Sequence, residues 1–279
     1  MKRIDAHQHF WQYDARAYSW INPASVLAAT HEPADLKPLI EAAGIDGCIA
    51  VQARQDAAET RWLIDLAAAH PWIVGVVGWV DLRADDIAER LSAAPAGAPI
   101  VGYRHVVQDE QEDDFLLTPA FVRGVRAVLA HGLAYDILIT PRQASHVRRF
   151  AEMAGYGRLI LDHGAKPNIA AGDWQPWAAS IADMAQVPTI FCKVSGLVTE
   201  ADHAAWTPDD IARYLDHLLG CFGPDRLIFG SDWPVCRLAA DYVRVHDLIA
   251  GFVARHCPDH AGAIFGGNAE RAYALGSAS

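Results

Sequence analysis

The chain has 279 residues, of which 52% are hydrophobic, and its net charge at neutral pH is −11. No stretch approaches the roughly 18 uncharged apolar residues of a membrane span, and the amino terminus lacks the apolar segment of a signal peptide, so we expect a soluble, cytoplasmic protein. The negative charge works against binding to nucleic acid or to an anionic membrane surface but leaves a small-molecule substrate open. The five cysteines lack CxxC spacing, which argues against a disulfide framework and a thiolate zinc site.

The first predicted strand, residues 3–11, carries two closely spaced histidines. Successive side chains of a strand point to opposite faces, so Asp5, His7 and His9 are predicted to share one face. A buried imidazole needs a partner for each ring nitrogen. A metal ion or a polar ligand would supply such partners, and ordinary hydrogen bonds at a strand end would do so equally well.

Strands and helices alternate along the rest of the chain. A loop without clear periodicity follows the first strand, residues 12–31, and loops of this length in compact domains are usually functional. Further strands are expected at 47–52, 73–79, 99–105, 133–138, 158–162, 189–193 and 226–230. Helices are expected at 34–43, 57–69, 84–93, 174–185, 242–256 and 268–275.

Three Thr-Pro pairs predict further helix starts, because each places a hydroxyl at the N-cap and proline at the first helical position. These pairs begin at Thr118, Thr140 and Thr207, and Gln143 completes a capping box with Thr140.

Eight strands separated by helices predict a parallel sheet, and eight such units at this length predict a closed (β/α)8 TIM barrel. We expect residues 1–279 to form this barrel as one domain. A doubly wound open sheet is the alternative, but the glycine-rich phosphate turn that often follows its first strand is absent.

The carboxyl ends of the barrel strands converge on one face, so their polar residues form a single candidate site. Each of these residues alone has an ordinary structural explanation, such as a salt bridge or core packing. The candidates are His7, His9, Gln52, Arg54, Trp79, Arg104, His105, Tyr135, Asp136, Asp162, His163, Lys193, Ser195, Ser231, Asp232 and Trp233.

A recognisable combination lies among these candidates: the pair His7 and His9, a histidine after the sixth strand, and Gly-Ser-Asp-Trp-Pro at 230–234. Together with the segments 4–11, 102–105, 161–167, 193–197 and 267–271, it resembles the amidohydrolase superfamily, specifically the sugar-lactonase branch of the amidohydrolase-2 group, whose members include fuconolactonase-like enzymes.

The resemblance implies that His7, His9, His163 and Asp232 stand where family members place metal ligands or their metal-free equivalents. The fifth strand offers no obvious bridging ligand, so a binuclear centre is not expected. One zinc would suit these nitrogen and oxygen ligands. Lactonase relatives can work without a metal, so we expect either no required cofactor or at most one zinc ion.

The resemblance also implies a hydrolase that opens the ring ester of a sugar (aldonic acid) lactone, such as L-fuconolactone, in sugar catabolism. Such a reaction needs a water activator, a stabiliser for the oxyanion and a proton for the ring oxygen. Asp232 is the candidate general base, and its alternative role is to orient His163 or to cap a turn. His9, His163 and Lys193 are candidates for stabilising the oxyanion, with His7 and Arg104 beside them.

A polyhydroxylated lactone requires hydrogen-bonding side chains and flat apolar surfaces. The candidates for this role are Gln52, Arg54, Trp79, Arg104, His105, Tyr135 and Trp233. Two other functions remain open: a zinc-dependent decarboxylase of an unsaturated or aromatic acid, and a non-catalytic barrel that binds a sugar acid. The sequence does not predict an oligomeric state.

Overall fold

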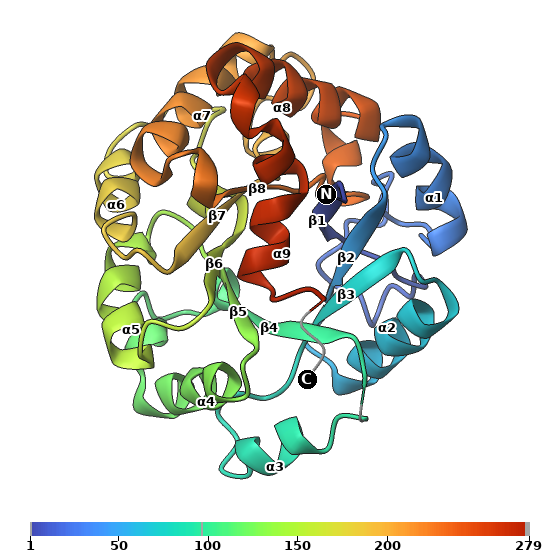
Figure 1. Ribbon diagram of the computed structural model, residues 1–279, viewed down its shortest axis with the longest axis vertical. Helices are drawn as coiled ribbons and strands as arrows, with labels where there is room; N and C mark the ends of the chain where they lie inside the picture. Colours follow the sequence, from blue (N-terminus) through green and yellow to red (C-terminus); the bar gives the residue numbers. More distant parts are fainter. Residues whose placement is uncertain (1, 96, 277–279) are drawn as a thin grey trace.

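The computed structural model describes residues 2–95 and 97–276. Eight parallel strands follow one another around one sheet in chain order (Figure 1). They are β1 (Ile4–Gln8), β2 (Gly47–Val51), β3 (Ile73–Gly78), β4 (Ile100–Val106), β5 (Ala134–Leu138), β6 (Leu159–Leu161), β7 (Ile190–Val194) and β8 (Leu227–Phe229). All eight strands expected from the sequence are present.

The sheet closes between its first and last strands. The backbone N–H of Asp232 donates to the carbonyl oxygen of His7 at 2.8 Å, and the N–H of His9 donates to that of Trp233 at 2.7 Å. Gln8 forms a parallel bridge with Trp233. The fold is therefore a (β/α)8 barrel, as predicted, and the bonds that close it also bring His7, His9 and Asp232 together.

Helices surround the barrel (Figure 1). They are α1 (Pro33–Ala42), α2 (Ala57–Ala69), α3 (Ile87–Ser92), α4 (Pro119–Ala130), α5 (Val147–Ala154), α6 (Trp177–Met184), α7 (Pro208–Phe222), α8 (Tyr242–His256) and α9 (Asn268–Ala272). No helix in the described residues is long and apolar enough to cross a membrane.

Two of the three Thr-Pro predictions are confirmed, because α4 and α7 begin at the prolines that follow Thr118 and Thr207. The prediction at Thr140 is wrong: residues 140–143 form a turn, and α5 begins only at Val147. The side chain of Gln143 does accept from the N–H of Thr140 at 2.9 Å, but its amide also donates to the carbonyl of Val107. Gln143 thus ties the turn to the loop after β4 instead of opening a helix.

The barrel lumen is apolar near its amino-terminal end. Inward-facing side chains of the strands, among them Ile4, Val51 and Ile228, pack there with residues of α9 and the adjoining Tyr273. Figure 1 shows α9 lying across this end of the barrel. The amino-terminal end of the barrel is therefore closed by apolar side chains, and the polar site lies toward the opposite end.

The first strand departs from the predicted alternation. Its pairing with β2 shifts register between Asp5 and Gln8. Ile4 and Ala6 face the lumen, whereas Asp5 accepts hydrogen bonds from the backbone N–H groups of Ser231 and His7. The prediction that Asp5 shares a face with the two histidines is therefore wrong, since the irregularity changes the phase of the strand before His7.

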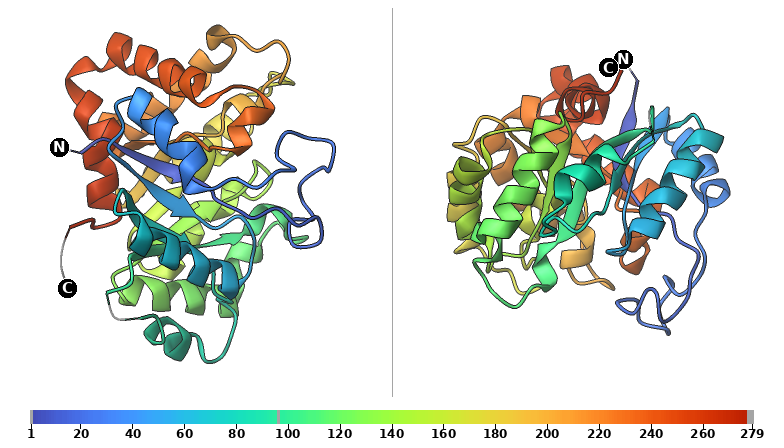
Figure 2. Two further views of the ribbon diagram at one scale, coloured as in Figure 1. Left: turned by 90° about the vertical axis from the view of Figure 1, so that its right-hand side faces the viewer. Right: turned by 90° about the horizontal axis from the view of Figure 1, so that it is seen from below.

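The segment 12–31 has a small core of its own, formed by Trp11, Tyr18, Ile21 and Leu27. Figure 2 shows this segment projecting from the side of the barrel opposite the two chain ends. That side carries the carboxyl ends of the strands, so the segment stands beside the candidate site.

Candidate active site

Three histidines surround one carboxylate oxygen at the carboxyl end of the barrel. The Oδ1 atom of Asp232 lies 3.4 Å from Nε2 of His9, 3.8 Å from Nε2 of His7 and 4.0 Å from Nε2 of His163. All four side chains are buried. Residues from the first, sixth and eighth strand ends therefore meet at one point.

The backbone holds two of these residues in an uncommon conformation. His163 and Asp232 have φ values of +53° and +57°, the left-handed region that few residues other than glycine adopt. Such conformations cluster at functional sites. Gly196, at φ +63°, packs against both, since a Cβ there would lie 2.4 Å from Nδ1 of His163 and 3.2 Å from Oδ2 of Asp232.

Hydrogen bonds to the inner ring nitrogens orient two of the histidines. Nδ1 of His9 lies 2.8 Å from the carbonyl oxygen of Val51, an atom that can only accept, so Nδ1 carries the proton. The Nε2 of a neutral His9 is then an acceptor that faces the carboxylate of Asp232. Two acceptors at this distance require a proton, a water molecule or a cation between them. Nδ1 of His163 pairs with the hydroxyl of Ser195 at 2.9 Å.

A charged layer lies directly beneath the histidines. Nζ of Lys193 donates to Asp136 at 2.6 Å and contacts Asp162 at 2.9 Å and Nδ1 of His7 at 3.0 Å. The hydroxyl of Tyr273 donates to the same oxygen of Asp136 at 2.7 Å. Lys193 is fully buried, so it holds the floor of the site together and does not reach a substrate directly.

Arg104 on β4 joins this layer to the cavity. Its Nη1 donates to Asp162 at 3.0 Å and lies 3.2 Å from Nε2 of His7. Its Nη2 donates to the backbone carbonyl of Gln52 at 2.6 Å. The side-chain amide of Gln52 in turn donates to the carbonyl of Arg104 at 3.3 Å. Gln52, predicted to bind substrate, therefore positions Arg104.

The electrostatics keep Asp232 ionised and His163 neutral. Burial alone would raise the pKa of Asp232, but the three neighbouring histidines outweigh it and hold that pKa far below its usual range. Burial lowers the pKa of His163 to about 4, against the opposing attraction of Asp232. Burial likewise lowers the pKa of His7, although Asp162 opposes it. The site thus offers an ionised carboxylate beside the neutral imidazoles of His7 and His163 at neutral pH.

The carboxylates of the lower layer differ from one another. Burial would raise the pKa of Asp162, but Lys193, His7 and Arg104 hold it well below its usual range. For Asp136, burial dominates and raises the pKa to about 6 even though Lys193 opposes it. Together with Asp232 above them, these two carboxylates make three negative charges at neutral pH against the two positive charges of Lys193 and Arg104, which leaves the region able to attract a cation.

The donor atoms around Asp232 fit a zinc ion. Zinc favours histidine nitrogen and carboxylate oxygen at about 2.0 Å, and tetrahedral ligands at that distance lie about 3.3 Å apart. His7, His9 and Asp232 form one group whose ligand atoms all lie within 4.8 Å of one another, and His163 approaches the same oxygen. Lys193 and Tyr273 both donate to Asp136, and both bonds end on its Oδ2 atom.

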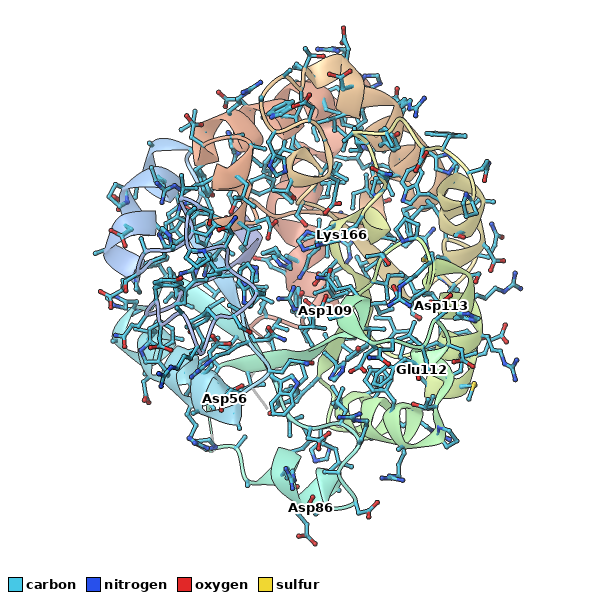
Figure 3. The ribbon with its side chains drawn as sticks, turned by 180° about the vertical axis from the view of Figure 1, so that it is seen from behind. Asp56, Asp86, Asp109, Glu112, Asp113 and Lys166 are labelled. Carbon is cyan, nitrogen blue, oxygen red and sulfur yellow. The ribbon has the colours of Figure 1, made fainter. Side chains whose placement is uncertain are left out.

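A cavity of about 500 Å³ opens above these groups. Its floor includes His9, Arg104, His163 and Asp232. Its walls and rim combine polar and apolar side chains. The polar ones are Ser19, Arg54, Gln55, Gln108, Asp109 and Lys166, and Trp20 is the largest apolar one. Lys166 and Asp109 lie near the middle of this face in Figure 3, whereas Asp86 lies at its edge. A volume of this size suits a small ligand.

Comparison with known proteins identifies the family to which this barrel belongs. The family model described as Amidohydrolase matches residues 4–275. The chain belongs to the amidohydrolase family. It is 42% identical to a protein of Burkholderia multivorans named L-fucono-1,5-lactonase, with 98% of this chain and 96% of that protein covered. An L-fucono-1,5-lactonase of Burkholderia ambifaria is 36% identical over the same shares of the two chains.

The backbone of a solved structure superposes closely on that of this amidohydrolase. A Burkholderia multivorans amidohydrolase with bound zinc superposes with a TM-score of 0.94 at 42% identity, covering 99% of this chain and 100% of that one. The resemblance drawn from the sequence motifs is therefore confirmed at the level of family and fold.

Two side chains predicted to bind substrate in this amidohydrolase, those of His105 and Tyr135, point away from the site. His105 stacks on Phe115 at 5.2 Å and pairs with Glu110 at 2.7 Å. Tyr135 packs against Phe121 and Phe150 between the barrel and its helices. These positions follow from strand alternation, since the adjacent residues Arg104 and Asp136 face inward.

Trp233 and Trp79 also lie outside the cavity lining. Trp233 packs against Phe10 and His31 and borders a separate cavity of about 500 Å³. Trp79 follows β3, where its backbone N–H and carbonyl both bond to the hydroxyl of Thr60. Of the seven residues predicted to bind substrate, Arg54 and Arg104 line the cavity.

Several lining residues of this amidohydrolase were not among the predicted site residues. Lys166 lies within the segment 161–167 that carried the family resemblance, and Gln55 follows Arg54 directly, so both could have been predicted from their neighbours. Trp20 lies in the loop 12–31, whose length indicated a functional segment without indicating which of its residues line the site. Gln108 gave no signal, because the sequence does not reveal the path of its loop.

Proposed function

We propose that this amidohydrolase hydrolyses the ring ester of a sugar lactone, with L-fucono-1,5-lactone as the leading candidate substrate. The observation that carries the proposal is the placement of an ionised carboxylate, Asp232, among histidines and Arg104 on the floor of one cavity. The names of the relatives at 42% and 36% identity support the choice of substrate.

Asp232 is the proposed general base. A water molecule can donate a hydrogen bond to Asp232 Oδ1 on the cavity side, next to Nε2 of His9. The water oxygen attacks the lactone carbonyl carbon as Asp232 takes the proton. The low pKa of Asp232 makes it a weak base, but it also makes the protonated carboxyl a strong acid that can return the proton.

Arg104 and His163 are the proposed partners of the tetrahedral oxyanion. Both line the cavity, and Arg104 is fixed by Asp162 and Gln52 so that its charge needs no reorganisation during the reaction. The bond from the carbonyl carbon to the ring oxygen then breaks, and the proton held by Asp232 passes to that oxygen. The product is an open-chain hydroxy acid that ionises and releases a proton to solvent.

Lys193 and His7 are proposed positioning residues, because neither side chain lines the cavity. Lys193 holds the inner nitrogen of His7 and the carboxylates of Asp136 and Asp162 in one buried network. The sequence suggested Lys193 as a direct oxyanion donor, and its complete burial argues against that role.

A single zinc ion is proposed as an optional occupant of this site. His7, His9, His163 and Asp232 would hold it, as their donor types and spacing allow, and a bound zinc ion would supply Lewis acidity toward the lactone carbonyl. The related Burkholderia multivorans structure contains zinc, which supports this proposal.

The two alternatives considered from the sequence have less support. Neither of the relatives at 42% and 36% identity is named as a decarboxylase or as a binding protein. A purely binding barrel would also have no need of the buried, ionised carboxylate of Asp232 beside the neutral imidazole of His163. We keep a cytoplasmic location and the absence of nucleic-acid partners as predictions.

A pH-indicator screen of sugar lactones tests the proposal. The wild-type protein is expected to release acid from L-fucono-1,5-lactone faster than the spontaneous rate, and each lactone is assayed with and without a chelator. Absence of acid release from every sugar lactone, with or without added zinc, would rule the proposal out. Chelator-insensitive release would exclude an essential role for zinc while leaving the hydrolase proposal standing.

A further inference from the structure

Trp20 is a large apolar side chain that remains 46% exposed on the segment 12–31. A single exposed apolar residue is ordinary on a protein surface, so its exposure alone indicates nothing. Its location is informative, because Trp20 lines the same cavity as His9, His163 and Asp232. The catalytic steps proposed above do not involve the Trp20 side chain.

The Trp20 ring stands on a rigid support. It meets the buried ring of Trp11 edge to face, with centroids 5.6 Å apart and an angle of 85° between the planes. The indole nitrogen of Trp11 donates to the carbonyl of Ala29 at 2.8 Å, and the backbone of Trp11 pairs with that of His31 in both directions. The segment therefore has little freedom to fold Trp20 away from the cavity.

A cationic side chain stands next to this support. The guanidinium of Arg54, which also lines the cavity, lies 5.4 Å from the centre of the Tyr18 ring. The Tyr18 hydroxyl donates to the buried carboxylate of Glu59 at 3.0 Å. Glu59 also accepts from the backbone N–H groups of Ala53 and Arg54, each at 2.9 Å. One buried carboxylate thus joins the segment that carries Trp20 to the loop that carries Arg54.

We propose that Trp20 and Arg54 form a subsite for the sugar part of the substrate, distant from the ester carbon. The ring of a sugar lactone presents C–H groups on its faces and hydroxyl groups at its edge. Trp20 packs against the C–H face, and Arg54 donates hydrogen bonds to the hydroxyls. This inference rests on the proposed lactonase function and adds a residue that determines specificity for polyhydroxylated rings.

The test compares Trp20→Ala with Val26→Ala, a matched control. Val26 lies on the same segment, is 50% exposed and does not line the cavity. We expect Trp20→Ala to raise KM for L-fucono-1,5-lactone at least tenfold with kcat within about threefold of wild type. Trp20→Phe, which keeps a flat ring, should restore most of the loss, and Val26→Ala should match wild type.

Binding of the product acid, L-fuconate, measured by calorimetry gives a second readout that does not depend on turnover. Its Kd is expected to rise at least tenfold in Trp20→Ala and to stay unchanged in Val26→Ala. If Trp20→Ala melts well below wild type, Trp20→Gln replaces it under the same expectation.

Two results separate failure of this inference from failure of the proposed function. A wild-type protein that hydrolyses no sugar lactone removes the proposed function. An active wild type whose KM and L-fuconate affinity are unaffected by loss of the Trp20 ring removes only the subsite.

Discussion

At the scale of single residues, the site depends on which of two neighbouring side chains faces inward. The sequence brought His7, His9, His163 and Asp232 together correctly, because a repeated spacing and a family resemblance identified them. It could not decide between adjacent residues at the strand ends, where Arg104 faces the site and His105 does not. Both types are polar, so hydrophobic patterning carries no signal about which one turns inward.

Gly196 is expected to be indispensable for activity. In Gly196→Ala the new Cβ would lie 2.4 Å from Nδ1 of His163, so the imidazole must move. We expect kcat/KM for the lactone to fall on the order of 100-fold, since small displacements of a catalytic group cost about this much. Gly172→Ala is the matched control, because Gly172 has a similar φ of +71° with nothing within 4 Å of the added Cβ. Equal activity in the two variants would contradict the tight packing described here.

His163 should make the stability of the metal-free protein depend on pH. Its pKa is about 4 in the folded protein against an ordinary 6.5, so unfolding takes up a proton between these values. This contribution is complete above pH 6.5 and is lost as the pH falls toward 4, amounting to roughly 3 kcal/mol.

The measurement is the free energy of unfolding by urea with chelator present, for wild type and His163→Asn at pH 7 and pH 4. Wild type should lose more stability than the variant over this range. Asp5 and Asp136, whose pKa values burial raises to about 6, act in the opposite direction in both proteins and cancel in the comparison. Parallel pH profiles would show that His163 is not held neutral by burial.

At the scale of elements, the alternation of strands and helices was readable because each strand is a short apolar run between helical patterns. The residues from Thr140 are an exception, because they form a turn where a helix start was predicted. The capping signal was real, but the long-range bond from Gln143 to Val107 used the same side chain to fix a turn. The position of α9 could not be predicted either, because the sequence of a short carboxyl-terminal helix does not indicate which end of the barrel it covers.

Tyr273, next to α9, should support the site from below. Tyr273→Phe removes the hydroxyl that donates to Asp136, the carboxylate that Lys193 also contacts. We expect a loss of about 1–3 kcal/mol in the free energy of unfolding, because a buried carboxylate loses a partner. We also expect kcat to fall several-fold with little change in KM.

Tyr103→Phe is the control for this variant, because the Tyr103 hydroxyl makes no hydrogen bond within the described residues and the side chain is equally buried. Chemical denaturation and steady-state kinetics of both variants provide the measurement. If the two variants behave alike, the network from Tyr273 to Lys193 does not support the site.

At the scale of the whole molecule, the closed barrel followed from the number of strand and helix units and from chain length. The charged layer of Arg104, Asp136, Asp162 and Lys193, which lies between the apolar end of the barrel and the open cavity, could not be predicted in this way. Its residues come from four strands, and the register of those strands decides which side chains face inward. The register shift in β1, which turns Asp5 away from the face that carries the two histidines, was unpredictable for the same reason. Register is a property of paired strands and cannot be read from one strand alone.

Zinc should stabilise the whole fold if the histidines bind it as proposed. Added Zn²⁺ is expected to raise the melting temperature of the metal-free wild type, since a ligand at 100 times its Kd contributes about 2.7 kcal/mol. The shift should disappear in a His9→Ala, His163→Ala double variant and persist in His131→Ala, which alters an exposed histidine. A shift of equal size in all three proteins would place the zinc elsewhere.

The central claim is that Asp232 activates water against an ester carbon, and Asp232→Asn tests it most directly. The amide keeps the size and one oxygen acceptor of the carboxylate but cannot take a proton. With L-fucono-1,5-lactone, we expect kcat to fall roughly 10²–10⁴-fold, the usual contribution of a general base, while melting temperature and KM stay close to wild type. A folded Asp232→Asn protein that keeps kcat within tenfold of wild type would contradict the account.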